Sequence, residues 1–343
     1  MRHSLAAIAA LSTAALHAQW TIQASHTTAS LRGIHSLGAG IAWASGTNGV
    51  VLRTLDGGDT WQPCSVPPGA QTLDFRGIQA FDQSTAIVMS SGPGDLSRVY
   101  RTTDACRTWT LTFTNPDKEG FWDAIQFPSR DFGILIGDQV GGSFPLFVTT
   151  DQGRTWKKQT GIAALAKNQA IFAASNSAVL ASAGKLYVIT GGGTTSVFEA
   201  PLPSAASASH TNPGLTVGET AGGFSLASKG SGSDIVIVAV GGDYKSPDAT
   251  AGTAAMWTKA RWQTSQLTPG GYRSAVAYDP RTNTWITVGP NGTDLSTDDG
   301  RTWHPLKPAA GEPPDAARNW NALSLPFVVG PNGRIGKRLD GRR

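Results

Sequence analysis

Apolar residues occur in short runs along the whole chain, and turn-forming residues separate one run from the next. The first part of the chain shows four such runs, at residues 20–24, 31–37, 41–46 and 50–54. Each run has the length of a β-strand and is too short for most helices. The Asn48-Gly49 pair between the last two runs favours a two-residue hairpin turn. The pattern predicts sheets of four short strands.

Four copies of an eight-residue motif lie at the ends of such runs. The motif is S/T-x-D-x-G-x-T-W, at residues 54–61, 102–109, 149–156 and 296–303, with Cys106 replacing the glycine in the second copy. The aspartate can accept hydrogen bonds from its own turn, and the glycine permits the positive φ that the turn needs. The tryptophan starts the next strand and can fill the space between neighbouring sheets. We assign a structural role to Asp56, Trp61, Asp104, Trp109, Asp151, Trp156, Asp298 and Trp303.

The spacing of the tryptophans gives the number of repeats. Intervals of 41, 48, 47, 106 and 41 residues separate Trp20, Trp61, Trp109, Trp156, Trp262 and Trp303. The interval of 106 residues equals two repeats if one copy is lost near residue 200 and Trp262 ends a degenerate copy. The seven positions predict an all-β fold, a seven-bladed β-propeller.

The two ends of the chain are expected to meet in one blade. The last repeat stops where a motif and a fourth strand should follow, and Trp20 has no motif before it. The N-terminal strand would then complete the last blade and hide both sheet edges. Residues 19–343 are therefore predicted to form one closed propeller domain.

The first eighteen residues have the features of a secretory signal. Arg2 and His3 precede a short run rich in alanine and leucine, and Ala18 is a suitable cleavage point. The run is too short to cross a bilayer, and no later stretch is long and apolar enough to do so. The prediction is a periplasmic or secreted protein, with residues 1–18 removed, no membrane insertion after cleavage, and a monomeric state.

Charge and cysteine content narrow the possible partners. Loss of Arg2 with the leader lowers the formal net charge from +4 to +3, and no basic run occurs before the C-terminal end. Nucleic-acid binding is not expected. Export would place Cys64 and Cys106 in an oxidising compartment, where they could form a disulfide or remain two buried thiols.

Arginines recur at one position of the innermost strands. Arg32, Arg76 and Arg273 begin the inner strands of the first, second and sixth repeats, and Arg318 lies close to that position in the seventh. Their guanidinium groups would gather on one rim of the central channel and suit a carboxylate, a phosphate or an acidic protein segment. The alternative is that each arginine pairs locally with an Asp or Glu across a blade boundary.

Carboxylates accompany the arginines at the same rim. Asp123, Asp138 and Asp243 are predicted there, so a pair at glycosidase spacing is conceivable. The histidines of the mature chain have no metal-ligand spacing, and no nucleotide fingerprint or nucleophile motif is present. We expect no catalytic residue, no metal and no cofactor.

Residues 42–61 carry a resemblance to a known family. Ala42-Trp-Ala-Ser-Gly46, Asn48-Gly49, Asp56-Gly-Gly58 and Thr60-Trp61 resemble the repeat of photosystem II stability/assembly factor-like propellers, which carry BNR (Asp-box) repeats on a sialidase-like fold. The resemblance implies a non-catalytic scaffold that binds a protein partner or anionic ligand at an arginine-bearing face, where Arg32, Arg76 and Arg273 match repeat positions. A sialidase-like glycoside hydrolase is the alternative, and an oxidoreductase, a loose label in some relatives, ranks third.

Overall fold

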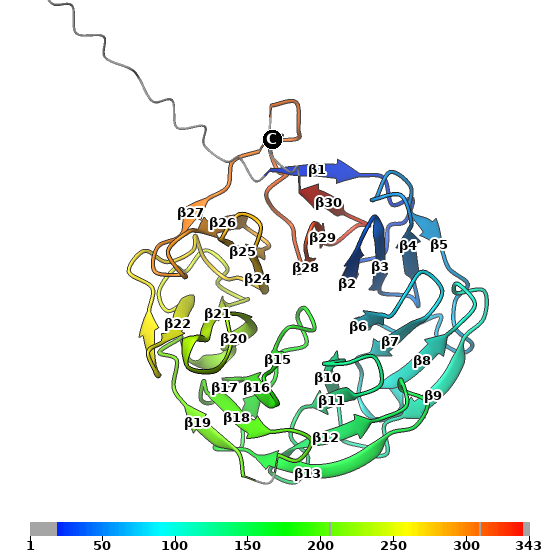
Figure 1. Cartoon of the computed structure of the whole chain (residues 1–343), viewed down its shortest axis with the longest axis horizontal. Coiled ribbons are helices and arrows are strands. Elements are labelled where there is room, and N and C mark those ends of the chain that lie inside the picture. The colour runs from blue at the N-terminus through cyan, green and yellow to red at the C-terminus, as the bar shows by residue number, and fades with distance from the viewer. Residues whose placement is uncertain (1–18, 206, 309, 339–343) are drawn as a thin grey trace, which may run out of the picture.

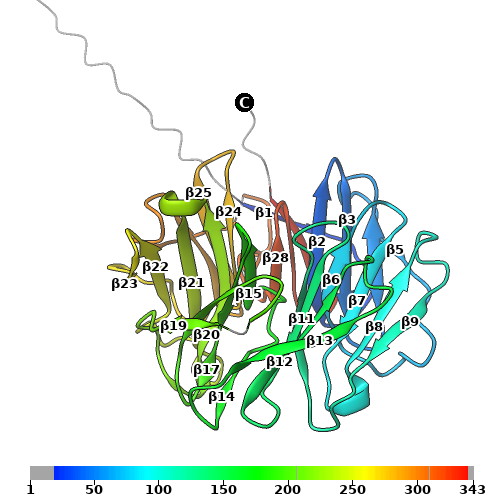
Figure 2. The same ribbon diagram turned by 60° about the horizontal axis from the view of Figure 1, so that its bottom comes forward.

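Seven antiparallel sheets form a ring around a central axis. The protein is described by a computed structural model, which covers residues 19–205, 207–308 and 310–338. Figure 1 shows the sheets arranged as blades in chain order, and Figure 2 shows them side on. Apart from two short 3-10 turns, η1 (Gly94–Leu96) and η2 (Gly232–Asp234), the described elements are strands. The predicted all-β, seven-bladed propeller is confirmed.

The first three blades are regular and have four strands each. Blade 1 contains β2 (Leu31–Gly38), β3 (Ile41–Gly46), β4 (Val51–Thr54) and β5 (Gln62–Pro63). Blade 2 contains β6 (Phe75–Ala80), β7 (Ala86–Ser90), β8 (Arg98–Thr102) and β9 (Thr110–Thr114). Blade 3 contains β10 (Trp122–Gln126), β11 (Gly133–Gly137), β12 (Ser143–Thr149) and β13 (Lys157–Ala163).

The next three blades include the least regular part of the ring. Blade 4 contains β15 (Val179–Ser182), β16 (Lys185–Ile189), β18 (Val197–Pro201) and β19 (Ser209–Thr211). Blade 5 contains β20 (Gly218–Lys229), β21 (Val236–Asp243), β22 (Ala254–Thr258) and β23 (Arg261–Thr264), and two short strands, β17 (Gly191–Gly192) and β14 (Gln169–Ala170), extend it on the β20 side. Blade 6 contains β24 (Ala275–Asp279), β25 (Thr284–Gly289), β26 (Gly292–Ser296) and β27 (His304–Pro305).

Blade 7 joins the two ends of the chain. It contains β28 (Ala322–Ser324), β29 (Phe327–Val329) and β30 (Ile335–Arg338), and its outer strand is β1 (Trp20–Gln23). Trp20 pairs with Arg338 and Gln23 with Ile335, so β1 runs antiparallel to β30 along its whole length. The prediction that the N-terminal strand completes the last blade is confirmed. The predicted signal, residues 1–18, lies outside the described residues.

The four motif copies form the same hydrogen-bonded corner. In the first copy, the Thr54 hydroxyl donates to Asp56 Oδ1 (2.7 Å) and accepts from the Gly58 N–H (2.9 Å). Asp56 Oδ1 also accepts from the Thr60 N–H (2.9 Å), and Oδ2 accepts from the Thr60 hydroxyl (2.6 Å). The Thr60 hydroxyl is the main reason why the pKa of Asp56 lies well below its usual value. The aspartates stabilise corners, as predicted from the motif.

The motif tryptophans lie between their own blade and the preceding one. Trp61 meets Phe327 of blade 7 edge to face (ring centroids 5.4 Å apart), and Trp156 packs parallel to Phe113 of blade 2 (6.3 Å). Trp303 belongs to a core cluster with blade 5, and Trp20 to one with blade 6. The indoles therefore act as wedges that hold adjacent sheets together.

Among the described residues, blades 4, 5 and 7 lack the motif corner, and in blade 7 the N-terminal strand β1 supplies the outer strand instead. In blade 5, Lys259 and Ala260 both have positive φ and form a tight turn between β22 and β23. Trp262 follows this turn on the outer strand and packs on Trp257 across the hairpin, so the degenerate motif copy expected there is a simple hairpin. In blade 4, as the spacing indicated, no copy is present between β18 and β19 in the residues described.

A loop at residues 171–178 fills the middle of the ring. It precedes β15 of blade 4 and reaches the axis, where Figure 1 shows it in green. The Asn176 side chain bonds both the N–H (2.7 Å) and the carbonyl (2.8 Å) of Ile125 in blade 3. The Ser175 hydroxyl donates to the carbonyl of Ser274, beside blade 6 (2.6 Å). The propeller axis is therefore plugged, which the sequence did not lead us to expect.

Cys64 and Cys106 form a disulfide in the structure. Their Cα atoms are 5.3 Å apart, and the bond links the end of blade 1 to the motif corner of blade 2. Cys106 stands at the motif glycine position and adopts φ +60°, a conformation that disfavours side chains. The cross-link holds the cysteine at this corner.

Candidate functional site

A pocket opens at the mouth of the plugged channel. Its volume is about 410 Å³, and inner strands of several blades and the loop at residues 171–178 supply its walls. Arg32, Arg76, Asp123 and Asp138 provide the charged groups of the lining. Five aromatic side chains complete it: Phe121, Phe172, Phe224, Tyr244 and Tyr272. We call this the mouth pocket.

Arg32 and Arg76 converge, as the sequence predicted. Each directs a guanidinium nitrogen at the carbonyl of Ala173, at 3.5 Å from Arg32 Nη2 and 3.0 Å from Arg76 Nη1. Arg76 also forms an ion pair with Asp74 (2.8 Å). Burial, and then the charge of Arg76, lower the pKa of Arg32. The Nε of Arg32 is buried without a hydrogen-bond acceptor among the described residues.

Arg273 does not join the other two arginines. Its side chain is 2% exposed and turns into blade 6, where Nε donates to Asp294 Oδ2 (2.7 Å) and Nη2 bonds the same oxygen. Its Nη1 donates to the carbonyl of Tyr272 (2.8 Å) and to Asn291. Asp294 is equally buried. A local ion pair therefore neutralises Arg273, but its carboxylate belongs to the same blade and not to a neighbouring one, as the alternative expected.

Two further predicted rim residues lie outside the pocket lining. Arg318 is exposed in the segment before β28. Asp243 accepts from the Thr220 hydroxyl (2.7 Å) and from the N–H of Lys245 (2.9 Å), which orders the turn that presents Tyr244 to the pocket. Of the seven predicted rim residues, the structure thus places four in the lining: Arg32, Arg76, Asp123 and Asp138.

Two carboxyl groups lie in the wall. Asp123 is 1% exposed, and neither of its oxygens has a hydrogen-bond partner in the described part of the chain. Burial, reinforced by the nearby Asp138, raises its pKa well above the usual value. Burial also raises the pKa of Asp138 to about 6, although Asp138 Oδ1 accepts from the N–H of Ile171 (2.9 Å). The pocket can therefore hold a protonated acid near neutral pH.

Asp138 is expected to make stability fall as pH rises from about 4 to about 6. Its pKa is raised from 3.8 to about 6 on folding, so across this range the folded state binds more protons than the unfolded state. Replacing Asp138 with Asn keeps an oxygen acceptor for the Ile171 N–H and removes the titration. The free energy of unfolding of the variant should equal that of the parent at pH 4 and should be higher by up to about 3 kcal/mol at pH 8. Urea unfolding at both pH values tests this, and parallel profiles for the two proteins would contradict it.

The aromatic walls and the plug were missed in the sequence. Phe172 stacks on Phe224 with ring centroids 4.2 Å apart and an angle of 7°, and Tyr272 meets Phe224 edge to face. These residues come from different blades, and only ring closure brings them together. The long interval without a motif, between Trp156 and Trp262, was the one signal that this part of the ring departs from the repeat.

Metal and membrane sites were also considered. Among the described residues, no group of three His, Cys, Asp or Glu side chains is placed to bind a metal ion. In the same part of the chain, no helix has the length and hydropathy required to traverse a bilayer.

Comparison with known proteins agrees with the architecture. Residues 147–158 match the BNR/Asp-box repeat. No curated protein matches the chain by sequence. YCF48 bound to D1 peptide is similar in structure at 15% identity, with a TM-score of 0.63 over 94% of this chain and 97% of that one. YCF48 from Cyanidioschyzon merolae gives 17% identity and a TM-score of 0.64 over 94% and 99%.

A glycoside hydrolase also shares the fold. The GH74 xyloglucanase from Xanthomonas campestris is 18% identical, with a TM-score of 0.62 over 93% of this chain and 53% of the enzyme. This chain thus spans about half the length of the xyloglucanase. At these identities the similarity concerns the fold alone. The chain is a seven-bladed β-propeller that carries the BNR/Asp-box repeat and resembles the photosystem II assembly factor YCF48 in fold.

Proposed function

We propose that this protein is an exported, non-catalytic scaffold whose mouth pocket binds an anionic group on a segment of a partner protein. One observation carries the proposal: Arg32 and Arg76 direct their guanidinium groups at one carbonyl, inside an open pocket with aromatic walls. A carboxylate that enters the pocket would meet donors of two arginines, and charge-assisted hydrogen bonds of this kind are among the strongest in proteins.

The electrostatics of the wall favour an anion. Asp74 neutralises Arg76, whereas no ion pair is found for Arg32 within the described residues. Asp123 lies close enough to Arg76 to feel its charge, but burial favours its neutral form. With Asp123 protonated, Asp138 is the carboxyl of the lining that opposes the arginines, and it too becomes neutral below a pH of about 6. A partially buried guanidinium without a counter-ion is costly, and an anionic ligand relieves that cost.

The aromatic side chains would add affinity and select a polypeptide. Phe172, Phe224 and Tyr244 offer flat apolar surfaces beside the arginines, and Tyr244 is 46% exposed. Such rings contact the side chains of an extended segment while arginines fix its charged group. A related fold, YCF48, has been solved bound to D1 peptide, which supports this kind of partner. The disulfide between Cys64 and Cys106 suits an exported protein.

Replacing both Arg32 and Arg76 with Gln should abolish partner capture and leave the fold intact. Both side chains line an open pocket, so the melting temperature should change by less than about 3 °C. The purified parent and the double variant would be used as baits in periplasmic extract and culture medium. The parent should retain a partner at low salt and lose it as the ionic strength rises, because screening weakens ionic contacts.

The matched control is Arg318→Gln, which removes one exposed arginine outside the pocket. It should capture the partner as the parent does. Equal capture by the double variant and the parent would reject the mouth pocket as the binding site.

A glycoside hydrolase is the second candidate, and the paired acids favour it. Asp123 and Asp138 share the pocket, and the raised pKa of Asp138, about 6, is of the kind that a general acid requires. Release of reducing ends from xyloglucan by the parent, and its loss in Asp138→Asn, would support hydrolysis over scaffolding.

A further inference from the structure

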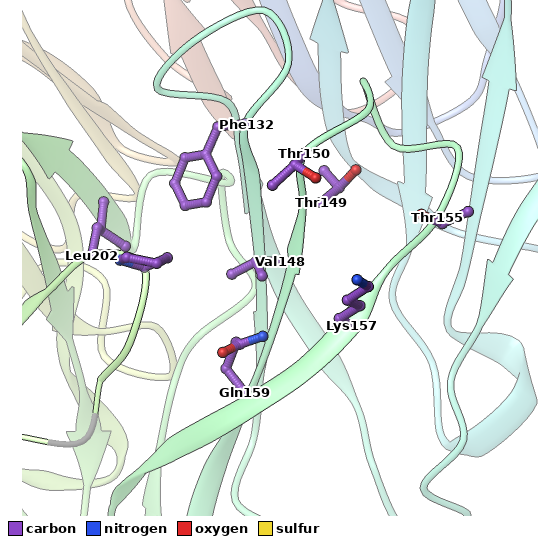
Figure 3. Close-up of a pocket in the computed structure, with 9 residues that line it drawn as sticks. Phe132, Val148, Thr149, Thr150, Thr155, Lys157, Gln159 and Leu202 are labelled. Atoms are coloured by element: carbon purple, nitrogen blue, oxygen red, sulfur yellow. The ribbon is translucent and has the colours of Figure 1, made fainter.

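A second pocket, on the outside of the ring, lies between blade 3 and blade 4. Its volume is about 470 Å³. Phe132, Val148, Lys157 and Gln159 line it from blade 3, and Leu202 and Pro203 line it from the segment after β18 of blade 4. Figure 3 shows Leu202 facing the blade 3 side chains. These residues and those of the mouth pocket do not overlap. We call it the wedge pocket.

The strands of blade 3 that line the wedge pocket can be compared with the equivalent strands of blade 2. Val148 precedes the motif of blade 3 as Arg101 precedes the motif of blade 2, and each pairs with the first residue of its outer strand. By the same register, Gln159 on β13 corresponds to Phe113 on β9. The walls of the wedge pocket therefore correspond to a defined surface of blade 2.

In blade 2 that surface holds the motif of the next blade. Arg101 donates to the carbonyl of Gln152 (3.1 Å) and to its side chain (3.0 Å). Phe113 lies parallel to Trp156, with an interplanar angle of 14°. The wedge pocket is thus the place where a motif tryptophan of blade 4 would pack.

Blade 4 supplies no such ring. Residues 202–208, between β18 and β19, contain neither a tryptophan nor an Asp-x-Gly sequence. Of the described residues in this segment, Leu202 and Pro203 line the gap. An apolar cleft with the geometry of an indole site remains open to solvent. Among the residues that line it, Lys157 is the only charged one.

We propose that the wedge pocket binds a small planar aromatic carboxylate of indole size. The ring would lie against Phe132, Val148 and Leu202, where the other blade gaps hold tryptophan, and the carboxylate would meet the ammonium group of Lys157. The volume falls within the usual range of small-molecule sites. The site is independent of the mouth pocket, because neither Arg32 nor Arg76 takes part.

The probe is indole-3-carboxylate, titrated calorimetrically into the folded protein. A ligand with a dozen heavy atoms in a partly open site should bind with a Kd of about 0.1–1 mM. Val148→Trp, which places an indole in the pocket, should weaken binding more than tenfold. Lys157→Gln should weaken it about threefold, as expected for an exposed charge pair, and should leave the binding of neutral indole-3-carboxamide unchanged.

The controls separate this site from the rest of the surface. Lys158, the next residue on β13, forms an ion pair with Asp117 (2.9 Å) and does not line the pocket. Lys158→Gln and the double variant at Arg32 and Arg76 should both bind the probe as the parent does.

Three results would overturn the proposal. The first is the absence of saturable binding up to about 10 mM, tenfold above the expected Kd. The second is unchanged binding of the probe to Val148→Trp. If that variant does not fold, the corresponding result is unchanged binding of the carboxylate to Lys157→Gln. The third is binding of a tryptophan-containing peptide without binding of the free acid, which would assign the pocket to a partner protein.

Discussion

A chain that lacks residues 19–25 is expected to lose the closed ring and to aggregate. The deletion removes β1, whose four residues pair with β30, and leaves the edge of β30 exposed. It also removes Trp20, which packs on Trp320 with ring centroids 6.2 Å apart and donates to Thr293 of blade 6 (3.1 Å). Loss of a buried tryptophan alone costs about 3–5 kcal/mol, so the melting temperature should fall by at least about 10 °C.

Thermal unfolding and light scattering measure the two parts of this result. The matched control is Trp20→Phe, which keeps the strand and most of the apolar contact. Its melting temperature should lie between those of the deletion and the parent. A deletion that melts within about 2 °C of the parent and stays monomeric would show that β1 does not close the ring.

The second large effect is expected from Arg273→Gln. Arg273 and Asp294 are each 2% exposed, and the substitution leaves a buried carboxylate without its cation. Breaking a buried pair in this way costs about 3–5 kcal/mol, which corresponds to a fall of about 4–8 °C in melting temperature for a domain of this length. The double variant Arg273→Met, Asp294→Leu removes both charges and should recover at least half of the loss.

This experiment also decides between the two roles considered for Arg273. A structural ion pair predicts a lower melting temperature, with partner capture intact in the fraction that remains folded. If Arg273→Gln melts like the parent and fails to capture a partner, Arg273 belongs to the binding surface after all.

Local patterns determine which parts of the fold are visible in the sequence. The motif corner is built from residues within eight positions of one another. Each copy of the pattern formed by Asp56, Thr60 and Trp61 therefore predicts such a corner. Ring closure was also accessible, because Trp20 occupied a motif position without a motif. The place of Arg273 was not accessible: its N–H donates to the carbonyl of Gly241 as that of Leu31 donates to Gly330, so Arg273 takes the position of Leu31, one residue before that of Arg32. Side chains alternate along a strand, and its guanidinium therefore faces into the blade, where it pairs with Asp294 on β26.

The candidate site was predicted only in part for the same reason. Arg32 and Arg76 lie at one repeated strand position, which predicted that they meet at one rim, and Asp123 was expected near that rim as an accompanying carboxylate. The loop at residues 171–178 has no counterpart in the other blades, and its contacts join residues about 50 to 140 positions apart. No periodic pattern in a single sequence can encode such a loop.

The plug changes the mechanics of the ring. A propeller with contacts between neighbouring blades alone is a closed one-dimensional array, in which blades can shear independently. The loop at residues 171–178 ties blade 4 to Arg32 and Arg76 of blades 1 and 2 and, through Ser175, to Ser274 beside blade 6. The loop is a central cross-link, because it connects blades that are not neighbours in the ring. Distortion on one side of the rim is therefore expected to be transmitted across the axis to the blades that the loop contacts.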